Sequence, residues 1–366
     1  MKISTTKEQL LYGISLAEKV TGKKESLPVL SSILLEAKNG HLILRSTNLE
    51  AGIEIIIPAS IENDGVVAVA ASVISQTVRS VNSDIITLQD NEGNLLLKSK
   101  GSQNIIKAIP HEEFPSFIGK STTRGFMISR EHFLNALQSV LYAASPSMIR
   151  PELGSVSVVI EEGDIIAVAT DSFRLAEKKN THATKNKSGE LLIPLKHANE
   201  LVYVLERISA DEVEIGVEDV QCVVSGGGVR FVSRLIEGQF PNYKEIIPRS
   251  FTTKATILKT DFVEVLRKAR IFSGNDQHIG FHIYPKRKIF SAIARSAEIG
   301  EMSDIIDAAV SGEDLDINFH IGYLADCLSS IRSDSLTLDF AGTGKPLVIH
   351  GASDQAFMYL VMPLNR

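Results

Sequence analysis

The feature that most constrains the fold of this chain is a weak internal repeat with a period of roughly 125 residues. Three landmarks recur in the same order along the 366 residues: an amphipathic helix, a pair of apolar strands that ends in a polar break, and a short strand that leads into a second helix. A repeat of this length corresponds to a whole domain and not to a solenoid unit. The repeat therefore predicts an α+β protein of three similar domains, each with two helices and antiparallel sheets.

Apolar side chains spaced at i, i+3, i+4 and i+7 indicate the helices. Ser129 and Thr260 stand near the starts of two of these segments, and we expect them to act as N-caps. The first helix of each third is expected within 7–20, 130–144 and 259–272, and the second within 67–81, 191–208 and 317–331.

The apolar strand pairs are joined by turn sequences. Asn39-Gly40 and Glu162-Gly163-Asp164 are typical of β-hairpins. The polar break that follows the paired strands falls at Asn48, Asp171 and Ser296, which occupy equivalent places in the three thirds.

Two short polar linkers separate the thirds, near residues 121–126 and 249–255. We therefore expect domains at 1–122, 126–248 and 252–366. Because no low-complexity segment lies between the thirds, we expect them to pack edge to edge.

Composition excludes several classes of protein. With 38 basic and 44 acidic residues the chain is not a globally basic nucleic-acid binder, and the absence of low-complexity or charge-blocked segments argues against disorder. No run of 18 apolar residues and no signal peptide is evident, so we expect a soluble cytoplasmic protein. Cys222 and Cys327 are too few and too far apart for a disulfide framework or a zinc site.

The positive charge is concentrated on the expected helices. Those segments carry a net charge of +6 while the chain carries −6, which leaves −12 for the remainder. If the helices share one face, that face attracts phosphate, and with few aromatic residues it binds without sequence preference.

Several motifs suggest a catalytic or metal site but do not complete one. Residues 341–346 (AGTGKP) lack the first glycine, the Ser or Thr and the helix of a phosphate-binding loop, so a hairpin turn is expected there. Residues 225–231 (SGGGVRF) also indicate a turn, and His278 and His282 lie on a strand-like segment. No metal, cofactor or catalytic residue is expected, which favours a binding or scaffolding role.

Four motifs in order along the chain carry a resemblance to a known family. They are SLPVLSSILLEA (26–37), ATDSFRLA (169–176), GQFPNYKEIIP (238–248) and YLVMPLNR (359–366). Through them the sequence resembles the bacterial DNA sliding clamps, the β subunit of DNA polymerase III, over its whole length. The resemblance implies a homodimeric six-domain ring that encircles duplex DNA without sequence specificity. It also implies a clamp loader, the polymerase III catalytic subunit and other polymerases or repair proteins as partners, which dock short motifs containing Leu and Phe.

The resemblance implies three surfaces. Positions matching the DNA-facing surface of the family are Lys24, Arg150 and Lys196, to which the helical charge count adds Lys19, Lys23, Arg79, Arg267, Lys268 and Arg270. Positions matching the partner-peptide pocket are Leu153, Thr170, Phe173, Arg174, Leu175, Pro241, Ile246, Tyr323, Pro346, Leu360, Met362 and Pro363. Positions matching the dimer contact are Gln103, Asn104 and Ile106 against Ile271, Phe272, Glu301 and Asp304.

The chain departs from the family pattern at the pocket rim. Ser172-Phe173 replaces a frequent Gly-His, Glu245 stands where a basic residue is common, and the chain ends in Leu364-Asn365-Arg366. These departures predict an altered peptide preference. Two other functions stay open: a monomeric peptide-binding scaffold, and an enzyme with a phosphate or nucleotide site at Gly342–Lys345.

Overall fold

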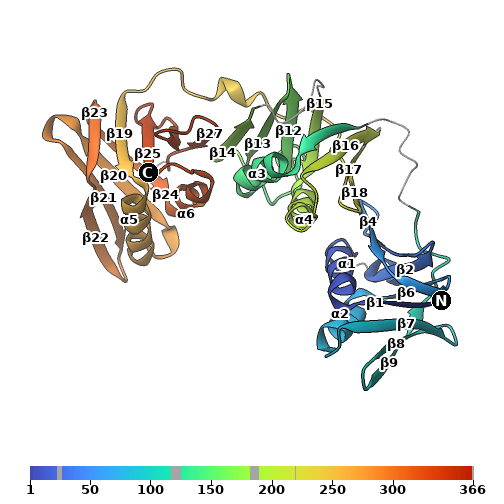
Figure 1. Cartoon of the computed structure of the whole chain (residues 1–366). Coiled ribbons are helices and arrows are strands. Elements are labelled where there is room, and N and C mark those ends of the chain that lie inside the picture. Colours follow the sequence, from blue (N-terminus) through green and yellow to red (C-terminus); the bar gives the residue numbers. More distant parts are fainter. Residues whose placement is uncertain (23–26, 117–124, 182–188, 219, 365–366) are drawn as a thin grey trace. The chain divides into compact units, whose positions relative to one another are not determined.

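The computed structural model describes residues 1–22, 27–116, 125–181, 189–218 and 220–364 (Figure 1). The chain forms two compact units, one of residues 1–134 with 196–235 and the other of residues 135–195 with 236–366. Each unit is α+β, with antiparallel sheets and few helices. Among the described residues, no helix combines the length and apolar character needed to cross a membrane.

The α-helices lie where the repeat predicts them. In each third, one helix follows the opening strand, and another follows the strand of the third landmark directly. The bounds are α1 (Lys7–Lys19), α2 (Ala71–Ser80), α3 (Arg130–Val140), α4 (Leu195–Leu205), α5 (Lys259–Phe272) and α6 (Ile321–Asp326). The 3₁₀ turns η2 (Leu141–Ala143) and η6 (Cys327–Ser330) extend α3 and α6.

Of the two predicted N-caps, one is confirmed and one is wrong. The Ser129 hydroxyl accepts the amide of His132 at 3.4 Å, as an N-cap does. Strand β19 (Thr253–Leu258) runs directly into α5, so the helix already begins at Lys259. Thr260 therefore lies inside the first turn, where its hydroxyl donates to Asp261 Oδ1 at 3.1 Å.

The described residues of the first unit form two sheets. The five-stranded sheet has the order β5 (Ser60–Asn63), β1 (Lys2–Thr6), β7 (Ile85–Asn91), β8 (Asn94–Ser99), β9 (Ser102–Ile106). The nine-stranded sheet has the order β10 (Ala108–Ile109), β6 (Gly65–Ala70), β2 (Ser32–Lys38), β3 (His41–Thr47), β4 (Ala51–Pro58), β18 (Val229–Arg234), β17 (Gln221–Gly226), β16 (Glu212–Glu218), β11 (Phe126–Ser129).

Two sheets are also formed by the part of the second unit that the structure describes. Its nine-stranded sheet has the order β15 (Gly189–Pro194), β12 (Ser155–Glu161), β13 (Asp164–Thr170), β14 (Arg174–Asn180), β27 (Phe357–Val361), β26 (Leu347–Gly351), β25 (Ser335–Phe340), β19, β23 (Ala308–Gly312). The four-stranded sheet has the order β22 (Gly300–Ile305), β21 (Ile289–Ser296), β20 (His278–Tyr284), β24 (Leu315–His320).

Each nine-stranded sheet joins strands from two thirds of the sequence. In the first unit β4 pairs with β18, so that Ile53 lies opposite Phe231. In the second unit β14 pairs with β27, so that Ala176 lies opposite Tyr359. The expected edge-to-edge packing of the thirds is therefore confirmed at both joins, and a compact unit does not coincide with one third.

Helix α1 shows how the amphipathic pattern becomes a packed layer. Leu10, Ile14 and Ala17 are fully buried on the stripe that faces the sheet. Gly13 lets the helix approach β3 closely, because a Cβ at this position would lie 2.9 Å from Leu44 Cδ1. Helices α1 and α2 pack beside each other in Figure 1.

The turn predictions are confirmed. Asn39 and Gly40 join β2 to β3 with φ of 54° and 76°, the backbone of a two-residue hairpin turn. Glu162 and Gly163 do the same between β12 and β13 with φ of 51° and 91°. Residues 341–346 form the connection between β25 and β26, with no helix after them.

Candidate functional site

The first candidate site is built on a turn at the start of β14. The Asp171 carboxylate accepts the amides of Phe173 (2.9 Å) and Arg174 (3.0 Å), while the Thr170 hydroxyl donates to the carbonyl of Arg174 at 2.7 Å. Ser172 occupies the left-handed region with φ of 78°. These bonds fix the backbone of Phe173 and Arg174 at one end of the strand.

The first third of the chain repeats this turn. Asn48 Oδ1 accepts the amides of Glu50 (3.0 Å) and Ala51 (2.7 Å), and the Thr47 hydroxyl donates to the carbonyl of Ala51 at 2.8 Å. Leu49 has φ of 76°, matching Ser172. The equivalence of Asn48 and Asp171 inferred from the repeat is therefore structural, but Ala51 stands where the second third has an arginine.

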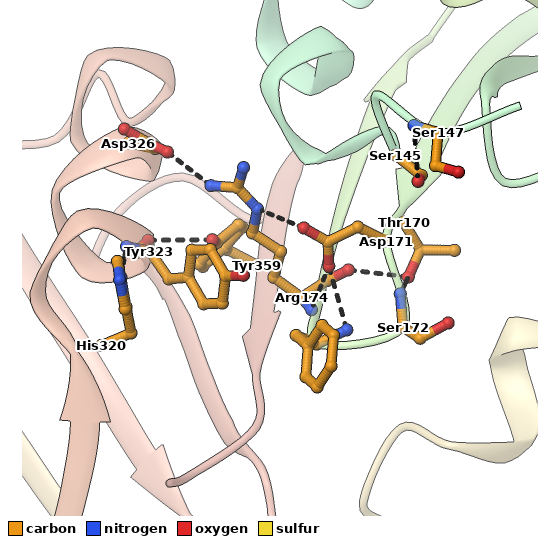
Figure 2. Close-up of polar contacts among 11 residues, drawn as sticks. Ser145, Ser147, Thr170, Asp171, Ser172, Arg174, His320, Tyr323, Asp326 and Tyr359 are labelled. Carbon is orange, nitrogen blue, oxygen red and sulfur yellow. Dashed lines mark hydrogen bonds and ion pairs between the residues drawn. The ribbon is translucent and has the colours of Figure 1, made fainter. Parts of the chain in front are cut away.

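The Arg174 guanidinium joins the turn to helix α6. Its Nε donates to Asp171 Oδ2 at 3.0 Å and its Nη1 donates to Asp326 Oδ2 (Figure 2). The guanidinium lies 4.4 Å from the centroid of the Tyr323 ring, a cation–π arrangement. Burial lowers the pKa of Arg174, but Asp326 and its other partners together raise it further, so the side chain stays charged.

Two further aromatic groups support this ion pair. The Tyr359 hydroxyl donates to the carbonyl of Tyr323 at 2.8 Å, which ties β27 to α6 (Figure 2). His320 is the N-cap of α6, where its Nδ1 accepts the amide of Tyr323 at 3.4 Å. Burial and the charge of Arg174 lower the pKa of His320, which favours the neutral ring that this acceptor role requires.

Beside the Arg174 network lies an apolar groove of about 410 Å³. Its floor belongs to a cluster in which Leu175 and Leu360 pack with Val168 and Val348. Tyr243 packs against this cluster and donates its hydroxyl to Glu177, which holds the segment carrying Ile246 to the sheet. The groove is lined by Thr170, Ser172, Arg174, Leu175, Ile246, Pro346, Leu360 and Met362.

Seven of the twelve positions expected at the peptide pocket line this groove, and five do not. The Leu153 side chain is buried in the core, and Tyr323 lies under the Arg174 guanidinium. Phe173 is 61% exposed beside the groove. Pro241 and Pro363 are half-buried outside the lining. Ser172 lines the groove, although the sequence indicated it only as a departure from the family pattern at the pocket rim. No motif in the sequence pointed to Asp326.

The cations expected at DNA fall into separate groups. Lys19, Arg79 and Lys196 line one cleft in the first unit, beside α1, α2 and α4. Arg267 and Arg270 line a smaller cavity of about 270 Å³ between α5 and α6. Lys23 and Lys24 lie outside the described residues.

The other two cations are already paired with carboxylates. The Lys268 ammonium lies 2.9 Å from Asp304 Oδ2, and Arg150 Nε lies 3.1 Å from Glu152 Oε1. Both pairs are at the surface, where ion pairs are weak and screened by salt.

The residues expected at a dimer contact lie at two sheet edges and one helix end. Gln103 and Asn104 are on β9, at the edge of the five-stranded sheet, and Glu301 and Asp304 are on β22, at the edge of the four-stranded sheet. Ile271 and Phe272 end α5.

The neighbouring isoleucines at the end of β9 differ in exposure. Ile106 is buried against its own sheet, because side chains alternate along a strand, and Ile105 is the exposed one.

Of the described residues, none form a group of three or more His, Cys, Asp or Glu side chains able to hold a metal ion. Both cysteines are buried, and burial raises the pKa of Cys222 to about 12. A thiol with such a pKa is not a nucleophile at neutral pH.

Comparison with known proteins gives one family. Three models of the DNA polymerase III β subunit match in chain order: the N-terminal domain at residues 1–118, the central domain at 127–242 and the C-terminal domain at 244–365. The chain is 24% identical to the beta sliding clamp of Staphylococcus epidermidis, and the alignment covers 100% of this chain and 99% of that relative.

Several solved structures have the same fold as this chain. The β subunit of DNA polymerase III from Thermotoga maritima is similar with a TM-score of 0.94 at 24% identity, over 100% of this chain and 99% of the other. The sliding clamp of Pseudomonas aeruginosa bound to griselimycin is similar with a TM-score of 0.93 at 23% identity, over all of both chains. The fold is thus that of the three-domain DNA clamps. The chain belongs to the DNA polymerase III β subunit family, and the relatives that it matches are sliding clamps.

Proposed function

We propose that this chain is a DNA sliding clamp, a processivity factor that holds the replicative polymerase and other DNA-processing proteins on duplex DNA. The observation that carries the proposal is the match of all three family domains, in order, along the chain. The function is non-catalytic: the protein contributes binding surfaces, and the polymerase contributes the chemistry. It acts in the cytoplasm, where replication takes place in bacteria.

The proposed molecule is a homodimeric ring. Its three domains span residues 1–122, 126–248 and 252–366, a division supported by the ranges of the matched models. The dimer joins the β9 edge of one protomer to the β22 and α5 region of the other, because unpaired strand edges favour pairing with another chain. A clamp loader opens and closes this ring around DNA.

The groove beside Arg174 is proposed as the docking site for partner motifs. Its apolar floor and the flexible Met362 side chain suit the Leu and Phe side chains of several different peptides. Arg174 at its border provides donors for peptide carbonyl groups. The polymerase III catalytic subunit, other polymerases, repair proteins and the clamp loader compete for this groove.

Primer extension tests this function. On a primed circular template with the clamp loader, ATP and the replicative polymerase of the same organism, we expect the chain to lengthen products made in a single polymerase encounter. Ile246→Ala should shorten those products and weaken peptide binding about fivefold, since Ile246 lines the groove and its loss removes roughly 1 kcal/mol of apolar contact.

Ile56→Ala is the matched control, because Ile56 is another exposed isoleucine that does not line the groove. It should leave both product length and peptide affinity unchanged. Products of equal length with and without the wild-type chain would contradict the proposed function.

A further inference from the structure

The first unit contains a polar cleft that shares no lining residue with the peptide groove. Its volume is about 760 Å³, and it is bordered by side chains of α1, α2 and α4. The lining residues are Ser15, Glu18, Lys19, Thr21, Arg79, Lys196, Asn199, Glu200 and Tyr203.

Three cations from three different helices converge on this cleft. Lys19 on α1 lies 5.4 Å from the centroid of the Tyr203 ring, and Lys196 on α4 lies 3.8 Å from Glu200 Oε1. Arg79 on α2 lies 3.9 Å from Glu18 Oε2, which also accepts the Ser75 hydroxyl at 2.7 Å. The charge of Glu18 is thus compensated within the cleft, whereas Lys19 and Lys196 leave a positive surplus.

Glu200 is the unusual member of the lining. The residue is only 4% exposed, and its Oε2 atom has no hydrogen-bond partner among the described residues. A buried carboxylate oxygen without a partner costs free energy when the group is ionised, and this favours the protonated form of Glu200. Burial raises the pKa of Glu200 to about 7, and Glu50 adds to the rise, while Lys196 and Lys19 oppose it.

We propose that this cleft binds one phosphodiester group of duplex DNA and that Glu200 takes up a proton from solvent when it does so. The inference rests on the proposed function, because DNA supplies the phosphate. In the bound state Lys19 and Lys196 neutralise the phosphate charge, and the protonated Glu200 adds no negative charge beside it. An ionised Glu200 places a second negative charge beside the phosphate and repels it.

The charges that face Glu200 agree with this coupling. Among the residues that line the cleft, Lys19, Arg79 and Lys196 against Glu18 leave a surplus of two positive charges when Glu200 is neutral, and ionisation of Glu200 halves that surplus. Glu50, which lies outside the lining, adds one negative charge that acts on Glu200. Binding of an anion therefore favours protonation, and protonation favours binding of the anion to the same extent.

His197 is another titratable group on α4 near this carboxyl. Burial and the charge of Lys196 lower its pKa, so the ring is neutral near pH 7. Its Nδ1 lies 3.0 Å from the Ser233 hydroxyl, and its Nε2 lies 3.9 Å from Glu50 Oε2. Its own titration therefore falls at a lower pH than that of Glu200.

The test measures DNA affinity against pH. A fluorescent duplex of about 30 base pairs is titrated with wild type, Glu200→Gln and Glu206→Gln. The titrations are made at low salt, because phosphate contacts are strongest there. We expect wild-type affinity to fall about threefold between about pH 6 and pH 8, through the titration of Glu200. Glu200→Gln should keep the high affinity throughout, because its side chain cannot ionise.

Glu206→Gln is the matched control. Glu206 lies on the same segment but is exposed and outside the cleft, so the variant makes the same Glu-to-Gln change without touching Glu200. It should retain the wild-type dependence on pH. Equal pH slopes in wild type and Glu200→Gln would overturn the inference and leave DNA binding intact, whereas no DNA binding by any protein at any pH would contradict the proposed function as well.

A second measurement does not depend on a variant. Calorimetric titration of the wild-type chain with the same duplex at about pH 7, in two buffers of different ionisation enthalpy, gives the number of protons taken up. We expect net uptake, and no uptake in either titration would overturn the inference.

Discussion

The Lys268 ammonium lies 2.9 Å from Asp304 Oδ2 and joins helix α5 to the edge strand β22. Sequence reasoning placed Lys268 on the DNA-binding surface and Asp304 at the dimer contact. The ion pair connects the two proposed surfaces: Asp304 raises the pKa of Lys268 and offsets part of its charge toward DNA. The two assignments are therefore not independent.

Lys268→Gln should accordingly weaken DNA binding less than Arg270→Gln. Arg270 is exposed on the same helix and borders the cavity between α5 and α6, and no carboxylate among the described residues forms an ion pair with it. Asp304→Asn should raise DNA affinity, because it releases the charge of Lys268. The affinity for duplex DNA is measured at low salt for all three variants. An equal loss of affinity in Lys268→Gln and Arg270→Gln would contradict this account.

The Arg174 network should stabilise the second unit as well as border its groove. Arg174→Lys keeps the charge but loses the planar fork that reaches both Asp171 and Asp326. We expect the free energy of unfolding to fall by about 2 kcal/mol, the value of a lost charged hydrogen bond in a partly buried site. Urea unfolding measures the change, and a fluorescent Leu/Phe peptide should bind more weakly to the same variant.

Lys179→Met is the control for Arg174→Lys. It removes a cation from the same strand, but the pair of Lys179 with Asp164 lies at the surface. Its unfolding midpoint should stay close to that of wild type. If Arg174→Lys were as stable as Lys179→Met and bound peptide normally, the network would have no structural role.

Glu200 should make stability fall as pH rises. Its pKa in the folded chain is raised to about 7 from an ordinary value of 4.5, so between these values the unfolded chain is ionised while the folded chain still holds the proton. Its contribution to stability is therefore fully present below about pH 4.5 and lost as pH rises through about 7. The loss amounts to about 3 kcal/mol, since each unit of pKa shift corresponds to about 1.4 kcal/mol.

Glu200→Gln lacks this titration. Between about pH 4.5 and pH 7.5, the free energy of unfolding of wild type should therefore fall by about 3 kcal/mol relative to that of Glu200→Gln. Urea unfolding at a series of pH values measures the difference. Parallel curves across this window would mean that Glu200 titrates as an ordinary carboxyl.

Ile105 should be the anchor of the proposed dimer contact on β9. It is 64% exposed on an unpaired strand edge, whereas its neighbour Ile106 points inward. Ile105→Lys should lower the mass in solution from about 80 kDa to about 40 kDa at micromolar concentration, since one chain has a mass of 39.9 kDa. Ile56→Lys, within a sheet and away from this edge, should leave the mass unchanged, and an unchanged mass in Ile105→Lys would exclude this edge.

Local sequence signals were enough for the helices, the hairpins and the repeat. The apolar periodicity of α1 and the Asn39-Gly40 turn depend on residues close together in the chain, and so does the Asn48 turn that Asp171 repeats. Thr260 failed as an N-cap because the start of α5 is set by the strand before it and not by the side chain at that position.

The tertiary contacts of the sites were not predictable in the same way. Arg174 and Asp326 are 152 residues apart, and the pairing of β14 with β27 helps to bring α6 to the turn. The i, i+4 spacing of Lys196 and Glu200 suggests an exposed helical pair, yet Glu200 is buried. The resemblance implies Ile106 at the dimer contact, but Ile105 is the exposed neighbour, and a shift of one residue along a strand exchanges its two faces.

The most direct test of the ring is retention on circular DNA. The labelled chain is loaded onto nicked circular DNA with a clamp loader and ATP, washed in high salt, and followed before and after the DNA is cut once. A closed ring predicts retention on the circle and loss from the ends after linearisation, because topological linkage does not depend on screened phosphate contacts. Equal retention on circular and linear DNA would contradict the ring and favour a monomeric peptide-binding scaffold.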